Sequence, residues 1–376
     1  MKIAFVYVRG RLARLADTRE GIAAREFFYG ALELQELGHE VQLQEIDIGP
    51  DAPAGSMIIQ LLYKLHLMPS KTNASLVRQL RALLPALNSC SAVVATASGP
   101  AYGLAMLAAS RQLRVPLIAI HCGIANHPLR YHRRMINALL LRHSRTMLYG
   151  DGEVGPVQRM FAVPRDRLQV NQFGVDTNFW RPDWQRNGDY ILAVGNDVRR
   201  DYALLLQLAR RMKEHFVVVT RQNLGEVPAN VEQVKGDWHA QALSDAGLRK
   251  LYQEAMLVVT PLQESVQPSG QSVCLQAMAC GKPVVLTRTT GLWSQEMMQD
   301  GHNVLLVPTG DLVALEQAVT SLVIDPIKRQ RLGESARRTV CDCGSISLFA
   351  SRLELLAEQV VKHTTGTPHG NNLGSI

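Results

Sequence analysis

Short apolar runs alternate along the chain with longer stretches in which apolar residues recur at helical spacing. Residues 2–8 are an apolar run that ends at a polar loop over residues 9–20. Apolar residues at near-helical spacing then cover residues 21–37, a Gly-His turn follows, and residues 40–46 form the next strand-like segment. A strand, a helix and a second strand in this order predict a βαβ unit, and therefore a parallel sheet covered by helices.

The same order recurs through the rest of the chain. Further strands are expected at residues 92–97, 116–120, 190–194, 216–220, 231–235, 257–261 and 284–286. Further helices are expected at residues 101–112, 201–215, 243–255, 272–279 and 345–362. Two successive sets of such units, in a chain of 376 residues, predict two α/β domains. Ligands of parallel sheets bind at the carboxyl ends of the strands, which places the loop over residues 9–20 at a binding mouth.

The boundary between the domains is expected near residues 181–189, where Pro182 and the pair Asn187-Gly188 indicate irregular structure. The tail of the chain holds Gly, Thr, Asn and His with almost no apolar residue, so we expect it to be disordered. The expected division is a first domain at residues 1–172, a second domain at 173–345, a closing helix at 346–363 and the disordered tail at 364–376.

Charge is unevenly distributed between the two halves. The net charge is +7, and residues 1–170 hold 20 Lys and Arg against 12 Asp and Glu, whereas the remaining residues hold 20 against 21. A basic half predicts an anionic partner. Residues 127–145 mix Arg with Leu, which predicts either a helix that lies on an anionic membrane or a covering helix whose charges face water. Basic and aromatic residues do not interleave, so no nucleic-acid partner is expected.

Several classes of protein are excluded by the composition. No apolar run reaches the roughly 18–20 residues that a membrane-spanning helix needs. The first residues look like a buried strand rather than a signal peptide. Six cysteines lack the spacing of a metal site, so we expect free thiols and no metal. These features indicate a cytoplasmic protein, with peripheral contact at the inner face of the membrane as an option.

One stretch, residues 268–283, combines a loop, a helix and a turn. Its sequence is Pro-Ser-Gly-Gln-Ser-Val-Cys-Leu-Gln-Ala-Met-Ala-Cys-Gly-Lys-Pro. Pro268 and Gly270 indicate the loop, the helix is expected to begin near Ser272, and Gly281 ends it. A Gly-Ser loop at the start of a helix offers free N–H groups and the positive end of the helix dipole, which suit a phosphate group.

This stretch resembles the donor-site segment of the family 4 glycosyltransferases, which are retaining enzymes of the GT-B fold. The family segment carries two Glu residues separated by seven positions and continues as Ala-Met-Ala-x-Gly-x-Pro-Val. Residues 276–285 match its second half, whereas Pro268 and Gln276 stand at the two Glu positions. Residues 171–182 also resemble the family's interdomain stretch, in which Gly-Val-Asp-x-x-x-Phe recurs. The resemblance implies an α/β protein of the GT-B type, with two Rossmann-like domains that face each other across a cleft.

The same resemblance implies a retaining, metal-independent transferase without a cofactor. It would move a sugar from a nucleotide-diphosphate sugar, bound by the second domain, to a glycan, a lipid-linked acceptor or a small molecule. The leaving phosphate itself would act as the base toward the acceptor. The replaced acid pair leaves an alternative, a catalytically silent GT-B protein that binds a sugar nucleotide or a partner glycosyltransferase.

The resemblance also implies roles for single residues. Gly195 and Asn196 follow a strand and resemble the family's Gly-Arg-x-x-x-x-Lys loop, so Arg200 is the expected cation for the diphosphate, and Arg221 could add a second. His121 follows another strand and is expected to orient the donor sugar. The further donor-binding candidates are Trp238, Ser269, Gly270, Gln271, Ser272, Val273, Gln276 and Glu296, and the acceptor-side candidates are Arg19, Glu20 and Gly21. Trp238 is equally compatible with a place in the core, and Glu296 with a helix start.

Overall fold

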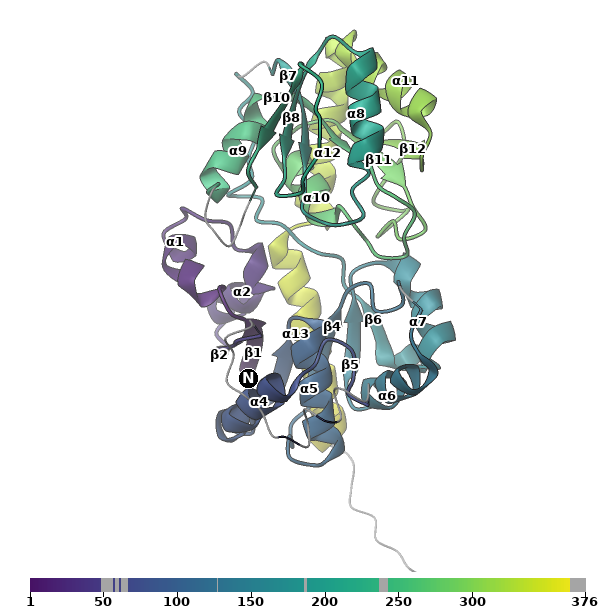
Figure 1. Cartoon of the computed structure of the whole chain (residues 1–376). Coiled ribbons are helices and arrows are strands. Elements are labelled where there is room, and N and C mark those ends of the chain that lie inside the picture. Colours follow the sequence, from purple (N-terminus) through teal and green to yellow (C-terminus); the bar gives the residue numbers. More distant parts are fainter. Residues whose placement is uncertain are drawn as a thin grey trace, which may run out of the picture.

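The computed structural model describes residues 1–48, 57, 61, 67–126, 128–185, 188–236 and 243–365. Within these ranges the chain forms two six-stranded sheets, one in each of two domains that lie end to end (Figure 1). Every pair of neighbouring strands within the two sheets is parallel. The expected α/β architecture with two Rossmann-like domains is therefore confirmed.

The first sheet has the strand order β2-β1-β3-β4-β5-β6. Its strands are β1 (Lys2–Val8), β2 (Glu40–Ile46), β3 (Ala92–Ala95), β4 (Leu117–His121), β5 (Arg145–Leu148) and β6 (Leu168–Val170). The helices of this domain are α1 (Leu15–Arg19), α2 (Ala31–Glu36), α4 (Ala74–Leu87), α5 (Ser98–Ala109), α6 (Tyr131–Leu141) and α7 (Val154–Phe161). Short 3-10 helices lie at Leu12–Arg14, Glu26–Phe28, Asp151–Glu153 and Arg165–Arg167.

The second sheet has the strand order β12-β11-β10-β7-β8-β9. Its strands are β7 (Tyr190–Val194), β8 (His215–Val219), β9 (Val231–Val234), β10 (Ala255–Thr260), β11 (Val284–Arg288) and β12 (Leu305–Pro308). Its helices are α8 (Tyr202–Arg211), α9 (Asp245–Glu254), α10 (Gln271–Ala279), α11 (Leu312–Val323) and α12 (Pro326–Cys343). The central strands β3, β4 and β7 are buried along their whole length, as expected where helices cover both faces of a parallel sheet.

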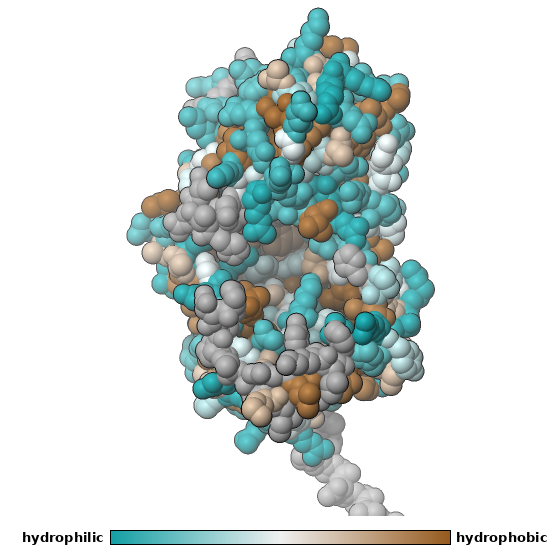
Figure 2. All heavy atoms as spheres, viewed as in Figure 1, coloured by the Kyte–Doolittle hydropathy of each residue, from teal (hydrophilic) through white to brown (hydrophobic). Residues whose placement is uncertain are grey.

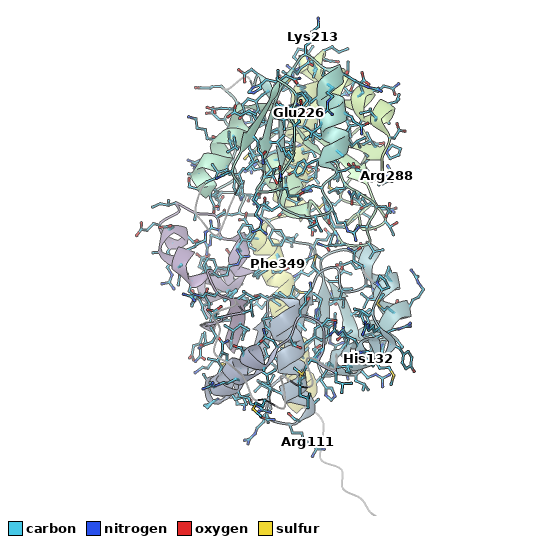
Figure 3. All side chains as sticks on the ribbon, in the orientation of Figure 1. Arg111, His132, Lys213, Glu226, Arg288 and Phe349 are labelled. Carbon is cyan, nitrogen blue, oxygen red and sulfur yellow. The ribbon has the colours of Figure 1, made fainter. Side chains whose placement is uncertain are left out.

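The last helix, α13 (Ile346–Thr365), returns to the first domain (Figure 1). Its residue Phe349 is buried in that domain (Figure 3), and the backbone oxygen of Phe349 accepts a hydrogen bond from the side chain of Asn171 at 3.0 Å. Further along the helix, Glu354 pairs with His39 at 2.6 Å. The chain passes between the domains twice, and the two passages meet where Val175 bridges Ser345.

The expected helix over residues 21–37 is wrong in extent. A short helix already begins at Leu15, and only Ala31–Glu36 of the expected range is α-helical. Tyr29 and Gly30 adopt the left-handed conformation, with φ of 54° and 81°, and this interrupts any continuous helix. Gly30 also packs so closely on α13 that an added Cβ would stand 3.0 Å from the Cβ of Ala350. The close approach to α13 therefore overrides the helical spacing of the sequence.

Three expectations concern what the chain lacks. In the described ranges, no helix combines the length and the apolar character that crossing a bilayer requires. The same residues contain no cluster of three or more His, Cys, Asp or Glu side chains placed to hold a metal ion. All six cysteines are free thiols in the structure.

Candidate functional site

A cavity of about 560 Å³ lies between the two domains. Figure 2 shows the surface hollowed at this level. Its walls come from the carboxyl ends of strands in both sheets, including Val8 of β1 and Val194 of β7. From the first domain the cavity is lined by Val8, Arg9, Gly10, Arg11, Arg14, Phe27, Tyr29, Cys122, Tyr149 and Phe173. From the second domain it is lined by Val194, Gly195, Asn196, Asp197, Arg200, Gln267, Pro268, Ser269, Gly270, Gln271, Ser272, Val273 and Gln276.

The amino end of α10 faces this cavity. Gly270 precedes the helix with φ of +79° and offers no side-chain acceptor to the N–H groups of the first turn. A Cβ at this position would lie 2.7 Å from Nη1 of Arg200 and 2.9 Å from Cγ2 of Thr260, so backbone conformation and space both require glycine. The expected helix start was Ser272, and the structure places it one residue earlier, at Gln271. The first turn thus presents its N–H groups and dipole to the cavity.

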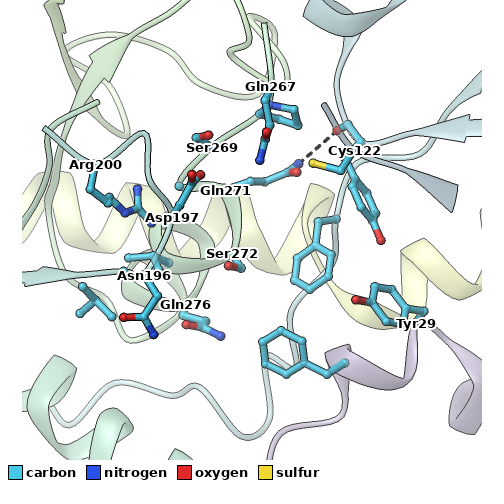
Figure 4. A pocket seen from close by; sticks show the side chains of 18 of the residues that line it. Tyr29, Cys122, Asn196, Asp197, Arg200, Gln267, Ser269, Gln271, Ser272 and Gln276 are labelled. Carbon is cyan, nitrogen blue, oxygen red and sulfur yellow. Dashed lines mark hydrogen bonds between the residues drawn. The ribbon is translucent and has the colours of Figure 1, made fainter. Parts of the chain in front are cut away.

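Arg200 lies against the start of α10 (Figure 4). Its guanidinium sits between Gly195 and Gly270, where a side chain at either glycine would collide with it. Only 6% of the residue is exposed, and Nε and Nη1 have no hydrogen-bond acceptor in the described part of the chain. A buried cation with two such nitrogen atoms is costly, so this arrangement is typical of a site that receives an anion.

Other polar groups surround the same point. The Ser269 hydroxyl is buried and likewise lacks a partner among the described residues. Arg9 and Arg11 line the opposite wall, and the guanidinium of Arg11 lies 4.9 Å from the ring centre of Phe27. Among the lining residues given above, Asp197 is the only acid. Arg9 and Arg14 pair with Asp47 and Asp245 outside this set, so Arg11 and Arg200 against Asp197 leave a small excess of positive charge, which favours an anionic ligand.

Asn196 lines the cavity, but its amide holds protein segments together. The Nδ2 group donates to the backbone oxygen of Gly236 at 2.5 Å. The Oδ1 atom accepts from the backbone N–H of Arg221 at 2.7 Å and from the Thr220 hydroxyl at 3.4 Å. Asn196 thus fixes the ends of neighbouring strands, and the cation at this loop is supplied by Arg200.

Two glutamines of α10 reach across to the first domain. Gln271 Nε2 donates to the backbone oxygen of Tyr149 at 3.3 Å, the contact drawn in Figure 4. Gln276 Nε2 donates to Oε1 of Glu26 at 2.9 Å, and Gln276 Oε1 accepts from the Tyr252 hydroxyl at 3.3 Å. Glu26 is fully buried, and burial raises its pKa to about 7, against the opposing effect of its hydrogen bonds from Gln276 and Trp180. Sequence analysis did not single out Glu26.

His121 lies beside the cavity without lining it. It is the last residue of β4 and is 1% exposed, with Nδ1 3.1 Å from the Ser98 hydroxyl and its ring 5.0 Å from that of Tyr102. Burial, with a smaller effect of the Lys71 charge, lowers the pKa of His121 to about 3, so the imidazole is neutral at pH 7. The next residue, Cys122, lines the cavity instead.

A buried carboxyl group lies behind the same wall. Glu153 accepts a hydrogen bond from the backbone N–H of Gly123 through Oε1, while Oε2 is buried and has no partner in the described residues. Burial raises the pKa of Glu153 to about 8. Gly123 has φ of +66° and packs against the Gln267 side chain of the second domain. Glu153 therefore supports a loop that touches the donor side of the cavity.

The remaining donor-side candidates are not gathered at the cavity. Arg221 and Glu296 are exposed and do not line it. Trp238 lies outside the described residues.

The acceptor-side candidates lie elsewhere as well. Arg19 borders a separate depression of the first domain, and neither Glu20 nor Gly21 lines the interdomain cavity. From the same loop, Arg9 and Arg11 do line it. These two residues follow β1 closely, so the rule that ligands bind at the carboxyl ends of parallel strands could have identified them.

Comparison with known proteins relates the second domain to a family. Residues 188–325 match the family model of the glycosyl transferases group 1. The chain is 24% identical over 265 residues to MMP alpha-(1->4)-mannosyltransferase of Mycolicibacterium hassiacum, covering 68% of this chain and 62% of that protein. It is 26% identical over 203 residues to alpha-maltose-1-phosphate synthase of Mycobacterium tuberculosis, covering 46% of this chain and 51% of that protein. The chain thus spans between about half and three fifths of the length of these relatives.

Solved structures agree with the fold over nearly the whole chain. Sucrose-phosphate synthase from Thermosynechococcus elongatus superposes with a TM-score of 0.72 at 17% identity, covering 96% of this chain and all of that one. HepE from Anabaena, solved with UDP and glucose, gives a TM-score of 0.68 at 16% identity with the same coverage. WaaG, a glycosyltransferase involved in lipopolysaccharide biosynthesis, gives 0.59 at 16% identity and covers 97% of this chain. The chain is therefore a two-domain GT-B protein whose second domain matches the group 1 glycosyl transferases.

Proposed function

We propose that this protein is a glycosyltransferase that uses a nucleotide-diphosphate sugar bound in the interdomain cavity. The observation that carries the proposal is the meeting of three groups at one point of the cavity: the Arg200 guanidinium, whose Nε and Nη1 have no acceptor among the described residues, the buried Ser269 hydroxyl and the amino end of α10. A diphosphate matches this set of donors in charge and in hydrogen bonding. The mannosyltransferase and synthase named among the relatives support a transferase reaction.

The chemistry follows from these positions. As the bond between sugar and phosphate breaks, negative charge grows on the leaving diphosphate, and Arg200 and the α10 dipole are already oriented to stabilise it. The protein's own cations thus supply the charge stabilisation that the proposed metal-independent reaction needs. We propose that the reaction retains the configuration of the sugar, with the leaving phosphate as the base toward the acceptor. Gln276 would contact the ribose, and Gln271 the sugar or phosphate.

The first domain would receive the acceptor and shape the sugar site. Arg9, Arg11 and Tyr29 combine cationic and aromatic surface on that wall, which suits a glycan, a lipid-linked sugar or a small anionic molecule. His121 is buried and does not line the cavity, so we assign it a positioning role for the wall rather than a direct contact with the sugar.

An exposed stripe on α6 favours a lipid-linked acceptor. The stripe consists of Tyr131, Met135 and Leu139, which are 76%, 47% and 55% exposed and recur every four residues. The sequence has no Asp or Glu between residues 52 and 150, so this segment carries cations without acids of its own. We propose peripheral contact of this stripe with an anionic membrane, where each nearby cation contributes about 1 kcal/mol.

The position of α6 agrees with such a contact. His132 of α6 lies on the outer side of the first domain, away from the interdomain cavity (Figure 3). The guanidinium of Arg134 donates to the backbone oxygens of Met160 and Arg159, which holds its charge against α7.

Thermal unfolding with UDP, GDP and ADP tests the donor site. A ligand at 100 times its Kd stabilises the folded state by about 2.7 kcal/mol, so at least one nucleotide should raise Tm clearly. The same increase should be absent in Arg200→Ala. Transfer of radiolabelled sugar from the matching donor then tests the reaction. If none of the three nucleotides raises Tm, the proposal is refuted, whereas binding without transfer would favour a catalytically silent protein.

A further inference from the structure

The buried carboxylate of Glu26 joins three parts of the chain that are far apart in sequence. Its Oε1 atom accepts from the Trp180 indole N–H at 2.6 Å and from Gln276 Nε2 at 2.9 Å. Its Oε2 atom accepts from the backbone N–H of Asp176 at 3.2 Å. Trp180 and Asp176 belong to the passage between the domains, and Gln276 belongs to α10, so Glu26 connects the first domain to both.

These contacts determine the orientation of the Gln276 amide. A carboxylate oxygen accepts and cannot donate, so the NH₂ end of Gln276 must face Glu26. The oxygen end then faces the Tyr252 hydroxyl, which donates to it at 3.3 Å. The orientation persists when Glu26 is protonated on Oε2, because Oε1 still accepts from both Trp180 and Gln276. The orientation of the amide is therefore fixed at a residue that lines the cavity.

We propose that Glu26 is a positioning residue of the donor site, which holds the Gln276 amide in the single orientation that binds a hydroxyl pair of the nucleotide sugar. This inference rests on the proposed function. In this arrangement the negative charge beside the Gln276 amide comes from Glu26 of the first domain. The amide on α10 supplies a neutral hydrogen-bond donor and acceptor. The donor site is then complete only when the two domains are together.

The same geometry explains why an amide stands at position 276. A glutamate there would place a second carboxylate at hydrogen-bond distance from Glu26, and two carboxylates so close share one proton or separate. The ionisable groups that interact electrostatically with Glu26 include Asp176 on the interdomain passage, Tyr252 on α9 and Cys280 directly after α10, and the charge of Arg200 acts on the same Tyr252 hydroxyl. Asp176, Tyr252 and Cys280 carry no positive charge, so none of these three would offset a second negative charge.

The test uses the full-length chain and calorimetric titration with UDP, GDP and ADP at pH 6.0 and pH 8.5. Each affinity of a variant is divided by the wild-type affinity at the same pH, which cancels titration of the nucleotide itself. Gln276→Glu should bind the preferred nucleotide about tenfold or more weakly than wild type at pH 8.5, since one pKa unit corresponds to a tenfold change. At pH 6.0, where the pair can share a proton, its affinity should be within about threefold of wild type.

Two further variants isolate the role of Glu26. Glu26→Gln combined with Gln276→Glu leaves one carboxylate, so the ratio to wild type should no longer change between the two pH values. Gln207→Glu adds the same charge on the exposed face of α8 and should behave as wild type.

The inference is overturned if Gln276→Glu gives the same ratio at both pH values, or if the double variant keeps the pH dependence. Should Gln276→Glu fail to fold at pH 8.5, recovery of folding in the double variant would support the inference, and its absence would overturn it. A wild-type chain that binds none of the three nucleotides refutes the proposed function itself, and the donor-site role of Glu26 with it.

Discussion

Replacing Arg200 by methionine should stabilise the free protein and abolish its response to nucleotide. Methionine fills a similar elongated space without charge. In the free protein only 6% of the Arg200 residue is exposed, and Nε and Nη1 are unpaired in the described part of the chain, so removal of the guanidinium relieves a desolvation cost. In the complex the same atoms would bind the diphosphate, so the variant loses those bonds.

The magnitudes of the two effects follow from the two orphan N–H groups. An unsatisfied buried polar group costs about 1–3 kcal/mol, and about 1 kcal/mol shifts Tm by roughly 2–4 °C in a domain of this size. Arg200→Met should therefore raise the Tm of the free protein by at least about 2 °C. Two hydrogen bonds to a charged ligand contribute about 3 kcal/mol or more together, so nucleotide affinity should fall by roughly a hundredfold.

Thermal unfolding with and without the preferred nucleotide measures both effects in one experiment. Arg221→Met is the matched control, because Arg221 is exposed near the same strand ends and does not line the cavity. The control should keep the wild-type Tm and the wild-type response to nucleotide. A lower Tm for free Arg200→Met, together with an unchanged response to nucleotide, would refute the role assigned to this side chain.

Three further predictions address other parts of the molecule. Gly270→Ala should destabilise the fold by about 1–2 kcal/mol in urea unfolding, since its φ of +79° is left-handed, and should weaken nucleotide binding by displacing Arg200. The pKa of Glu153 is raised from 4.5 to about 8, so between these pH values the folded chain keeps a proton that the unfolded chain releases. The stability of the fold therefore falls as pH rises through this window. Glu153→Gln removes this effect and should raise Tm more at pH 8 than at pH 5. Serine at all three positions of the α6 stripe should reduce flotation with phosphatidylglycerol vesicles, whereas serine at Ile324 and Ile327, which are exposed on the second domain, should not.

The sequence predicted the strands better than the contacts between domains. The strands Lys2–Val8, Glu40–Ile46 and Tyr190–Val194 begin and end as expected, because buried parallel strands are short apolar runs with clear boundaries. The contact of Glu26 with Gln276 joins residues 250 positions apart, and no local pattern indicates it. A glutamate in a segment of mixed polar and apolar residues normally has an exposed side chain, and only the tertiary structure shows that Glu26 is buried.

The expected role of His121 shows a second limit. Its place at the end of a strand is correct, but the alternation of side chains along a strand turns it inward while Cys122 faces the cavity. The acceptor-side candidates show the same limit in a loop, since Arg9 and Arg11 line the cavity and Arg19 does not. In both cases the predicted segment borders the cavity, and local geometry within the segment determines which residue lines it.

The return of α13 to the first domain has a consequence for how the protein can be divided. The first domain is assembled from both ends of the described chain, and the second domain is an insert between them, bounded by the bridge of Val175 and Ser345. Cutting the gene at a single point would yield a first-domain fragment that lacks α13 and Phe349. The surface of the first domain on which Phe349 packs would then be exposed to water. Excising the insert and joining its two flanks by a short linker would instead keep that core whole, and would make the second domain a transferable cassette.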